Sequence, residues 1–158
     1  MNMKAVLDTS AILYLSDFSI FEEIFTVSEV LEEAKDRMSN LKISGLRIRV
    51  EEPSENSLGE VKKVAGETGD LEELSKTDLK LLALAKEKKC LLISDDRAVQ
   101  NVAKKMGINF ISLFSKKISK FILWGKYCKN CKKWFEGRFC PVCGEVLRRR
   151  PRRIEEIQ

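Results

Sequence analysis

The chain has 158 residues, of which 44% are hydrophobic and 34% charged, and its formal net charge is +5. This composition is typical of a folded globular protein and excludes a disordered chain. No apolar run reaches the roughly 18 residues of a membrane span, and no basic region precedes a long apolar stretch, so we expect a cytoplasmic protein without a membrane partner. Histidine is absent, which excludes a histidine general base.

Short apolar runs alternate with helical patterns along the chain. The runs predict strands at residues 4–7, 45–52, 90–94 and 109–112. The helical patterns predict helices after Asp8 and at residues 27–38, 76–89 and 96–107. Strands that alternate with helices predict an α/β fold, in which a parallel sheet carries helices on both faces. Such a sheet places its functional groups outside the carboxyl ends of its strands.

Local signals set the expected helix boundaries and the domain organisation. Thr77 is the expected N-cap of the helix at 76–89, and Gly107 is the expected stop of the next helix. Thr26 and Glu29 have the spacing of a capping box, which gives Glu29 a structural role. Four parts are expected along the chain: an α/β domain at 1–114, a connector of loop or helix at 115–125, a zinc ribbon at 126–147 and a basic tail at 148–158.

The C-terminal part contains four cysteines in two close pairs. The spacing C-x2-C-x8-C-x2-C lets both pairs turn their thiolates toward one tetrahedral zinc ion, and Gly144 fits the tight turn after the second pair. Two disulfides are the alternative, which a cytosolic location disfavours. We therefore predict one structural zinc ion with no open position for a reacting water, bound by Cys128, Cys131, Cys140 and Cys143. Cys90 is expected to be an ordinary buried residue.

Basic residues gather near the end of the chain. Residues 126–153 carry ten basic and two acidic side chains, which indicates an anionic partner, most often nucleic acid. The candidate phosphate contacts are Lys126, Lys129, Lys132, Lys133, Arg138, Arg148, Arg149, Arg150, Arg152 and Arg153. A solvated tail is the alternative for the arginines. Trp134, Phe135 and Phe139 can stack on bases, although at least two of them are expected in the ribbon's own small core.

Acidic residues stand where expected strands end and helices begin. Asp8 follows the first strand, Asp95 and Asp96 follow the strand at 90–94, and Asp78 opens a helix. A carboxylate in a first helical turn is stabilising by about 0.3–1 kcal/mol, which is enough to explain any one of these acids. Their recurrence at comparable places favours a shared site.

Glu33 is the acid nearest the apolar stripe of its helix, and a carboxylate at that edge can face a cleft. Several carboxylates in one cleft repel one another unless a cation neutralises them. Mg²⁺ and Mn²⁺ prefer oxygen ligands, and such an ion can activate a water for phosphodiester hydrolysis without any histidine. This chemistry suits a chain with a basic nucleic-acid-binding unit.

These motifs resemble those of a PIN-domain nuclease. "LDTSAIL", an acid on the following helix, "SKTDLKLLALA" and "LLISDDRAVQNVA" occur in the order of that family. The combination of "TGDLEELSKTDLKLLALA", "DDRAVQNV" and a C-terminal zinc ribbon is similar to the Nob family (Nin-one-binding proteins), endoribonucleases that finish the 3′ end of small-subunit ribosomal RNA. The resemblance covers about residues 4–147, and the short path between the second and third acids resembles the compact archaeal form.

The resemblance implies a PIN-like, Rossmann-like sheet and a set of site residues. The acids that hold Mg²⁺ or Mn²⁺ and catalyse fall on Asp8, Glu33, Asp78 and Asp96. Glu33 matches the family pattern V-x-x-E-x-x-D, Asp96 is preferred over a supporting Asp95, and Ser10 stands where the family often has a hydroxyl near the metal. The implied reaction is attack of water on one phosphodiester of precursor small-subunit rRNA, within the pre-ribosomal small subunit, leaving a 5′-phosphate and a 3′-hydroxyl.

Two other functions fit parts of the sequence. A PIN-type toxin would cut tRNA or mRNA, but such toxins usually lack a zinc ribbon. A non-catalytic RNA-binding assembly factor could use the same scaffold, since a fold does not prove an activity. An aspartate-nucleophile phosphatase needs a second aspartate two residues after Asp8, where this chain has Ser10.

Overall fold

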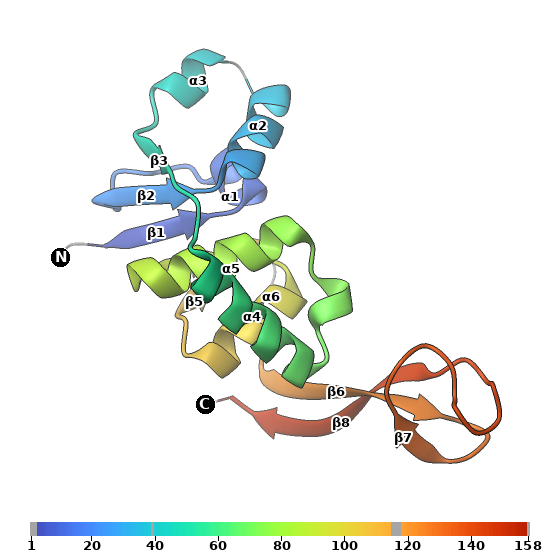
Figure 1. The fold of residues 1–158 in the computed structure, drawn as a ribbon. Helices are drawn as coiled ribbons and strands as arrows, with labels where there is room; N and C mark the ends of the chain where they lie inside the picture. The colour runs from blue at the N-terminus through green and yellow to red at the C-terminus, as the bar shows by residue number, and fades with distance from the viewer. Residues whose placement is uncertain (1–2, 39, 115–117, 158) are drawn as a thin grey trace.

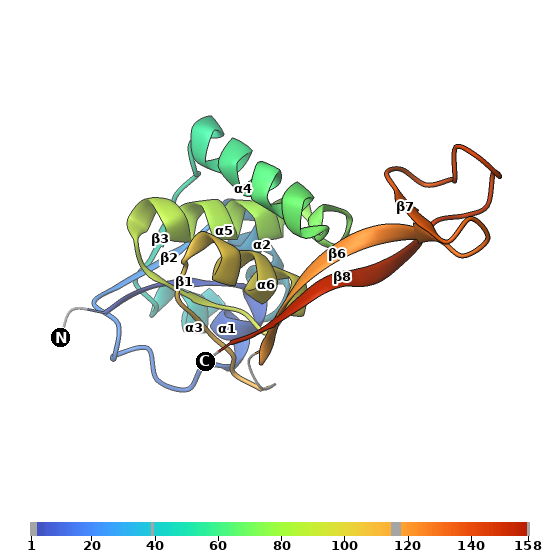
Figure 2. The same ribbon diagram turned by 90° about the horizontal axis from the view of Figure 1, so that it is seen from below.

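The computed structural model of the protein describes residues 3–38, 40–114 and 118–157. An α/β body is followed by a long antiparallel arm that projects from it and ends in a loop-rich tip (Figures 1 and 2). Within the described ranges, no helix combines the length and the apolar composition that crossing a bilayer requires.

The body is built on a five-stranded parallel sheet with the order β3-β2-β1-β4-β5. Its strands are β1 (Lys4–Leu7), β2 (Glu23–Thr26), β3 (Ile48–Val50), β4 (Leu91–Ile93) and β5 (Phe110–Ile111). The sequence predicted all of these except β2, whose four residues mix polar and apolar side chains. The chain order reverses between β1 and β4, and this is the place where open α/β sheets bind ligands.

Helices cover both faces of the sheet, as the sequence predicted. One face carries α1 (Thr9–Tyr14), α2 (Ser28–Arg37) and α3 (Asn40–Ser44), and the other carries α4 (Glu55–Thr68), α5 (Lys76–Lys88) and α6 (Arg97–Met106) (Figure 1). A short 3₁₀ turn, Leu71–Glu73, joins α4 to α5. The division follows from right-handed crossovers, because the chain steps in one direction from β1 to β3 and in the opposite direction from β3 to β5.

The core lies on both sides of the sheet. Strands buried on two faces are apolar throughout, and Val6, Leu7, Leu92 and Ile93 are at most 1% exposed. Cys90 is buried at the start of β4, as expected, and burial raises the pKa of its thiol to about 11. The carboxyl ends of β1 and β4 are thereby fixed on a rigid support.

Two helix caps differ from those expected. Ser75, not Thr77, caps α5, and it forms a full capping box with Asp78. The expected capping box of Thr26 and Glu29 is also wrong, because Thr26 ends β2 and its hydroxyl donates to the Leu7 carbonyl at 2.8 Å. Gly107 does end α6, in the left-handed conformation with φ of 73°.

Glu29 has a different partner from the one its spacing suggested. Its carboxylate lies 2.7 Å from Lys80 Nζ on α5, and the Ser28 hydroxyl donates to it at 2.8 Å. These contacts, Lys80 first, lower the pKa of Glu29 to about 2. Glu29 therefore has a structural role, but through an ion pair between α2 and α5.

The C-terminal arm is a three-stranded antiparallel sheet with the order β7-β6-β8. It contains β6 (Lys120–Cys128), β7 (Lys133–Phe135) and β8 (Arg148–Glu156). The helical option for the connector at 115–125 is therefore wrong for residues 120–125, which are strand, and residues 115–117 lie outside the described residues. The boundary expected at 126 falls inside β6, and most of the expected tail at 148–158 is β8.

The arm joins the body where β6 passes α4 and α6. The Asn101 side chain of α6 acts like a strand partner, because its amide donates to the Ile122 carbonyl at 2.7 Å and accepts from the Ile122 N–H at 2.8 Å. At the end of α4, Gly69 has φ of 82°, and a Cβ there would lie 2.5 Å from Trp124. Only glycine allows this approach of the two backbones.

Candidate active site and cysteine cluster

The acids that the sequence singled out line one cavity of about 490 Å³ at the carboxyl ends of β1 and β4. The helices that frame it come from both faces of the sheet. It brings together all six predicted site residues of the body: Asp8, Ser10, Glu33, Asp78, Asp95 and Asp96. No lysine or arginine is among the described residues that line it.

Asp8 is the most strongly perturbed of these acids. It is the N-cap of α1, and its carboxylate accepts from the Ala11 N–H at 2.8 Å. Burial raises the pKa of Asp8 to about 6, and the negative charges of Asp95 and Asp78 act in the same direction against hydrogen bonds from Ala11 and Ser94. A bound cation removes the cost of this buried negative charge, so Asp8 is suited to be a metal ligand.

Asp96 is the N-cap of α6, and Asp78 is the partner of Ser75 in the capping box of α5. Asp78 accepts from the Ser75 N–H at 3.0 Å, and Asp96 accepts from the Val99 N–H at 3.0 Å. Each of these bonds uses one oxygen of a carboxylate that has two. Capping holds the carboxylates in place and is compatible with metal binding.

Asp95 has a different role from Asp96. Its Oδ1 accepts from the backbone N–H groups of Leu113 and Phe114, both at 3.0 Å, and so anchors the chain that follows β5. This favours Asp96 as the metal ligand and Asp95 as its support. The assignment stays a prediction.

Hydroxyl groups that the sequence analysis missed complete the cavity. Thr9 donates to Glu33 Oε2 at 2.9 Å and thereby links α1 to the one acid supplied by α2. Ser94 is 3% exposed, and its hydroxyl accepts from the Asp96 N–H at 3.2 Å. Thr9 directly follows Asp8 in "DTS", and Ser94 directly precedes Asp95 in "SDD". This position beside a predicted acid is the sequence signal that could have identified both hydroxyls.

The chemistry of the carboxylates suits a hydrated divalent ion. Among the described residues, the four cysteines are the set of ligand residues whose donor atoms lie close enough together, within 4.8 Å, to hold an ion directly, and the acids of the cavity do not form such a set. Mg²⁺ usually keeps several waters and contacts one or two carboxylates directly. Several acids that line one cavity, with no lysine or arginine among the described residues of its lining, fit such a hydrated ion.

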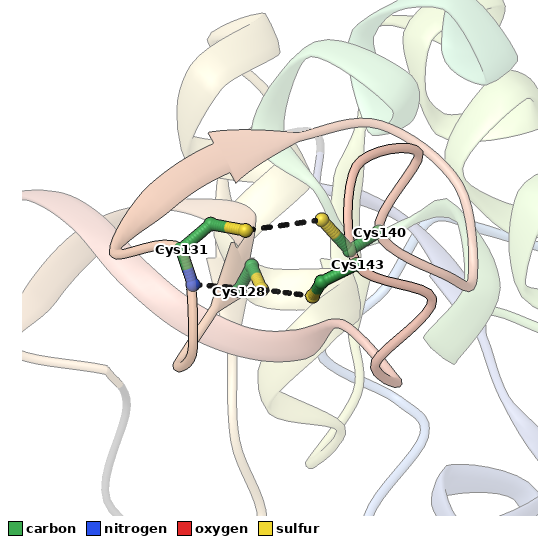
Figure 3. Close-up of side chains that lie close together, drawn as sticks. All are labelled: Cys128, Cys131, Cys140 and Cys143. Carbon is green, nitrogen blue, oxygen red and sulfur yellow. Dashed lines mark hydrogen bonds between the residues drawn. The ribbon is translucent and has the colours of Figure 1, made fainter.

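The four cysteines meet at the tip of the arm (Figure 3). The sulfur of Cys128 lies 3.5 Å from that of Cys143, and the sulfur of Cys131 lies 3.8 Å from that of Cys140. Two tetrahedral zinc–sulfur bonds of about 2.3 Å place their sulfurs roughly 3.8 Å apart. All four thiols are free, so the cluster has the geometry of a zinc site and not of two disulfides.

Backbone groups prepare these sulfurs for a cation. The N–H of Cys131 donates to Cys128 Sγ at 3.3 Å, and the N–H of Val142 donates to Cys140 Sγ at 3.4 Å. A backbone hydrogen bond from Glu145 lowers the pKa of Cys143 to about 6, whereas the neighbouring thiols raise that of Cys131 to about 12. Gly144 turns the chain with φ of 80°, as the sequence predicted. A cation would hold all four sulfurs as thiolates.

Comparisons with known proteins show the family of this chain. The family model described as the PIN domain of ribonuclease matches residues 5–87. A relative from Archaeoglobus fulgidus named "Endoribonuclease Nob1" is 42% identical over 91% of this chain and 90% of its own length. A protein of the same name from Pyrococcus abyssi is 39% identical over 97% of both chains. The chain belongs to the Nob family of PIN-domain endoribonucleases. The resemblance and the fold class that the sequence predicted are confirmed.

One relative of this Nob-family chain has a different name. "Ribonuclease VapC1" from Thermoplasma acidophilum is 35% identical over 94% of this chain and 79% of its own length. The match extends over most of the arm as well as the PIN domain. Family membership therefore supports a ribonuclease, while the choice of RNA needs an experiment.

The basic side chains of the arm fall into two groups. Lys126 and Arg149 are half-buried, and they form ion pairs with Glu72 at 3.0 Å and Asp70 at 2.9 Å. The other predicted phosphate contacts are exposed: Lys129, Lys132, Lys133, Arg138, Arg148, Arg150, Arg152 and Arg153. Arg149 thus joins the arm to the body, and the exposed group is the better candidate for RNA.

The three aromatic residues of the ribbon have different surroundings. Phe135 packs against the cysteine cluster. Trp134 is half-buried and lies edge-on to Tyr127, with ring centroids 5.1 Å apart. Phe139 is 57% exposed, so it is the ring of the three with free surface for a base.

Proposed function

We propose that this protein is a divalent-metal-dependent endoribonuclease that cuts precursor small-subunit rRNA at its 3′ end during ribosome maturation. The observation that carries the proposal is the cavity lined by Asp8, Glu33, Asp78, Asp95 and Asp96, in which burial and like charges raise the pKa of Asp8 to about 6. Family membership supplies the reaction class, and relatives of similar length bear the name "Endoribonuclease Nob1".

The side chains of the cavity would have different roles in the reaction. Asp8, Asp78, Asp96 and Glu33 would hold Mg²⁺ or Mn²⁺, Asp95 and Ser10 support them, and Thr9 holds Glu33 in position. An ion held there would supply an activated water and would stabilise the leaving oxygen of the phosphodiester. Water attack at phosphorus breaks the bond to the 3′ oxygen, so the products are a 5′-phosphate and a 3′-hydroxyl.

The arm would bind the RNA backbone. A zinc ion at the four cysteines would hold the tip in shape, and the exposed lysines and arginines around it would contact phosphates. Phosphate contacts position an RNA but do not read its sequence. The choice of site would therefore come from RNA shape and from the pre-ribosomal small subunit, in the cytoplasm.

A toxin ribonuclease acting on tRNA or mRNA is the second candidate, because one relative over nearly the whole chain is named "Ribonuclease VapC1" and not Nob1. A toxin should arrest growth when it is expressed and should cut tRNA or mRNA in preference to precursor rRNA. A non-catalytic assembly factor should bind RNA and cut none of these substrates.

The test is cleavage of an RNA that spans the 3′ end of small-subunit rRNA and its trailer. Wild type and Asp8→Asn are compared in Mn²⁺, Mg²⁺ and EDTA, with tRNA and an mRNA fragment as competing substrates. A single metal-dependent cut at the mature end, made by wild type alone, supports the proposal. Binding without any cut, on naked RNA and on pre-ribosomal particles alike, contradicts it.

A further inference from the structure

Two exposed aromatic rings lie next to each other outside the acidic cavity. Tyr14, the last residue of α1, and Phe114, after β5, are 56% and 70% exposed. Their ring centroids lie 5.5 Å apart at an interplanar angle of 76°. Aromatic side chains stabilise a fold mainly by burying area, so rings this exposed leave most of their surface free for another partner.

The chain connects both rings directly to the cavity. Tyr14 is four residues after Ser10, which lines the cavity, so the two lie on the same face of α1 about 6 Å apart along its axis. The N–H of Phe114 donates to Asp95, another residue of the cavity lining, at 3.0 Å. The aromatic pair is therefore at the rim of the acidic cavity.

A positively charged side chain lies beside Tyr14. Arg37 is exposed, and it is four residues after Glu33, on the same face of α2. Its Nη2 donates to the Tyr14 hydroxyl at 3.5 Å, while Thr9 donates to Glu33 at 2.9 Å. The two helices are thus linked at the cavity and again at its rim. Along α1 and α2, away from the cavity, the exposed side chains therefore change from carboxylates to an aromatic ring, Tyr14, and a guanidinium, Arg37.

This arrangement matches an unpaired nucleotide. A base stacks on an aromatic face, and a guanidinium pairs with a phosphate, but a base inside an RNA duplex has no free face to offer. We propose that Tyr14, Phe114 and Arg37 form a subsite for one unpaired nucleotide close to the phosphodiester that is cut. The inference rests on the proposed function, and it adds one base-binding subsite at the rim of the acidic cavity.

A purely structural role makes a different prediction. If the rings only linked α1 to the chain after β5, their loss would weaken folding and would affect all RNAs alike. A stacking role ties the rings to one base of the RNA. The deciding variable is therefore the base, which can be removed from the RNA without changing its backbone charge.

The experiment measures RNA binding in the Asp8→Asn protein, which we expect to hold the RNA without cutting it. The probes are single-stranded RNAs of the precursor 3′ region, each lacking one base, and the dissociation constant is read by fluorescence anisotropy. We expect a loss of about 5- to 100-fold at one position or two adjacent positions near the scissile bond. With Phe114→Ala added, this loss should vanish, while Phe114→Trp should retain it.

Three further variants test the phosphate contact, the specificity of the effect and the folding of the protein. Arg37→Gln should reduce the salt dependence of binding by about one phosphate contact. Ile20→Ala, an exposed apolar residue before the amino end of β2, should leave the whole profile unchanged. Thermal unfolding of each variant shows whether it is folded, and Phe114→Leu repeats the test with a larger side chain.

The outcomes separate this subsite from the proposed reaction. A profile that Phe114→Ala and Phe114→Leu leave unchanged, or one with no sensitive position near the scissile bond, overturns the subsite even if wild type cuts RNA. A profile that depends on Phe114, in a protein whose wild type cuts no RNA with any metal, supports the subsite and contradicts the endonuclease.

Discussion

Asp70 and Arg149 form an ion pair that joins the body to the arm across 79 positions of sequence. Arg149 Nη2 lies 2.9 Å from Asp70 Oδ1, and Asp70 is only 1% exposed. Thr68 and Asn101 donate to the other oxygen of Asp70 at 2.8 and 2.7 Å. The Arg149 guanidinium also lies 3.7 Å from the centre of the Trp124 ring. These contacts fix the direction in which β6 and β8 leave the body.

Loss of this pair should destabilise the protein strongly. Arg149→Gln leaves the buried Asp70 carboxylate without its cation, and we expect the free energy of unfolding to fall by about 2–4 kcal/mol. The matched control is Arg153→Gln on the same strand, where an exposed arginine pairs with nearby Glu155 and where we expect less than about 0.5 kcal/mol. Urea unfolding measures both variants, and equal losses would contradict the assignment.

Metal removal should affect the arm and spare the body. Without an ion the four sulfurs at the tip are no longer held together, so a strong chelator should release one zinc per chain and expose backbone amides of residues 128–147 to hydrogen exchange. Amides of β1 and β4 should stay protected. The control is Cys90→Ser, which should keep its zinc, whereas Cys143→Ser should lose it. Zinc retained by Cys143→Ser would argue against the four-cysteine site.

Asp8 should lower the stability of the protein when no divalent ion is added. Its pKa of about 6 in the folded protein exceeds the ordinary value of 3.8, so the ionised carboxylate is penalised in the folded state. The folded protein takes up this proton as the pH falls through 6, before the unfolded chain does. The cost is therefore full above pH 6 and disappears toward pH 4.

Asp8→Asn removes this cost and keeps the helix cap, because asparagine caps as well as aspartate. We expect it to stabilise the protein by about 1–3 kcal/mol at pH 8, and by close to nothing at pH 4. Urea unfolding over this pH range measures the difference. Asp17→Asn is the control, since hydrogen bonds from Ser19 lower the pKa of Asp17, and it should not stabilise at pH 8. A destabilised Asp8→Asn protein at pH 8 would contradict the prediction.

Substitution by asparagine should lower mainly the stability at Asp95 and mainly the cleavage rate at Asp96. Asp95→Asn weakens the acceptor for two N–H groups after β5, so we expect lower stability, by about 1–3 kcal/mol, and a partial loss of cleavage. Asp96→Asn keeps the cap of α6 and should retain stability while cleavage falls about 100-fold or more. Unfolding and cleavage are measured on both proteins. The reverse pattern would make Asp95 the ligand.

The sequence predicted the body well because its signals are local. Continuous apolar runs predicted β1 and β4, and the helical apolar stripe that ends at Gly107 predicted α6. Acids at the ends of these elements could be placed together because parallel strands end at one edge of the sheet. The zinc site was equally predictable, since each of the two close cysteine pairs depends only on the few residues around it.

The arm was not predictable in the same way. The strand β8 has the sequence "RRRPRRIEE", in which charge conceals any alternation, and its partner β6 lies at least 20 residues earlier. The junction depends on Asp70, Asn101 and Arg149, which approach one another only in the folded chain. The Ser75 cap was missed for a smaller reason, because Thr77 offers the same hydroxyl two residues later.

Mn²⁺ binding, measured together with cleavage, tests whether the acidic cavity is the metal centre of the reaction. Calorimetry gives the affinity for wild type, Asp8→Asn and the Asp17→Asn control, and single-turnover cleavage of the precursor RNA is followed at the same Mn²⁺ concentrations. We predict that Asp8→Asn weakens Mn²⁺ binding at least about 10-fold and cleavage at least about 100-fold, while Asp17→Asn matches wild type. Unchanged Mn²⁺ affinity in Asp8→Asn, or cleavage that survives this substitution, would show that the acidic cavity is not the metal centre of the reaction.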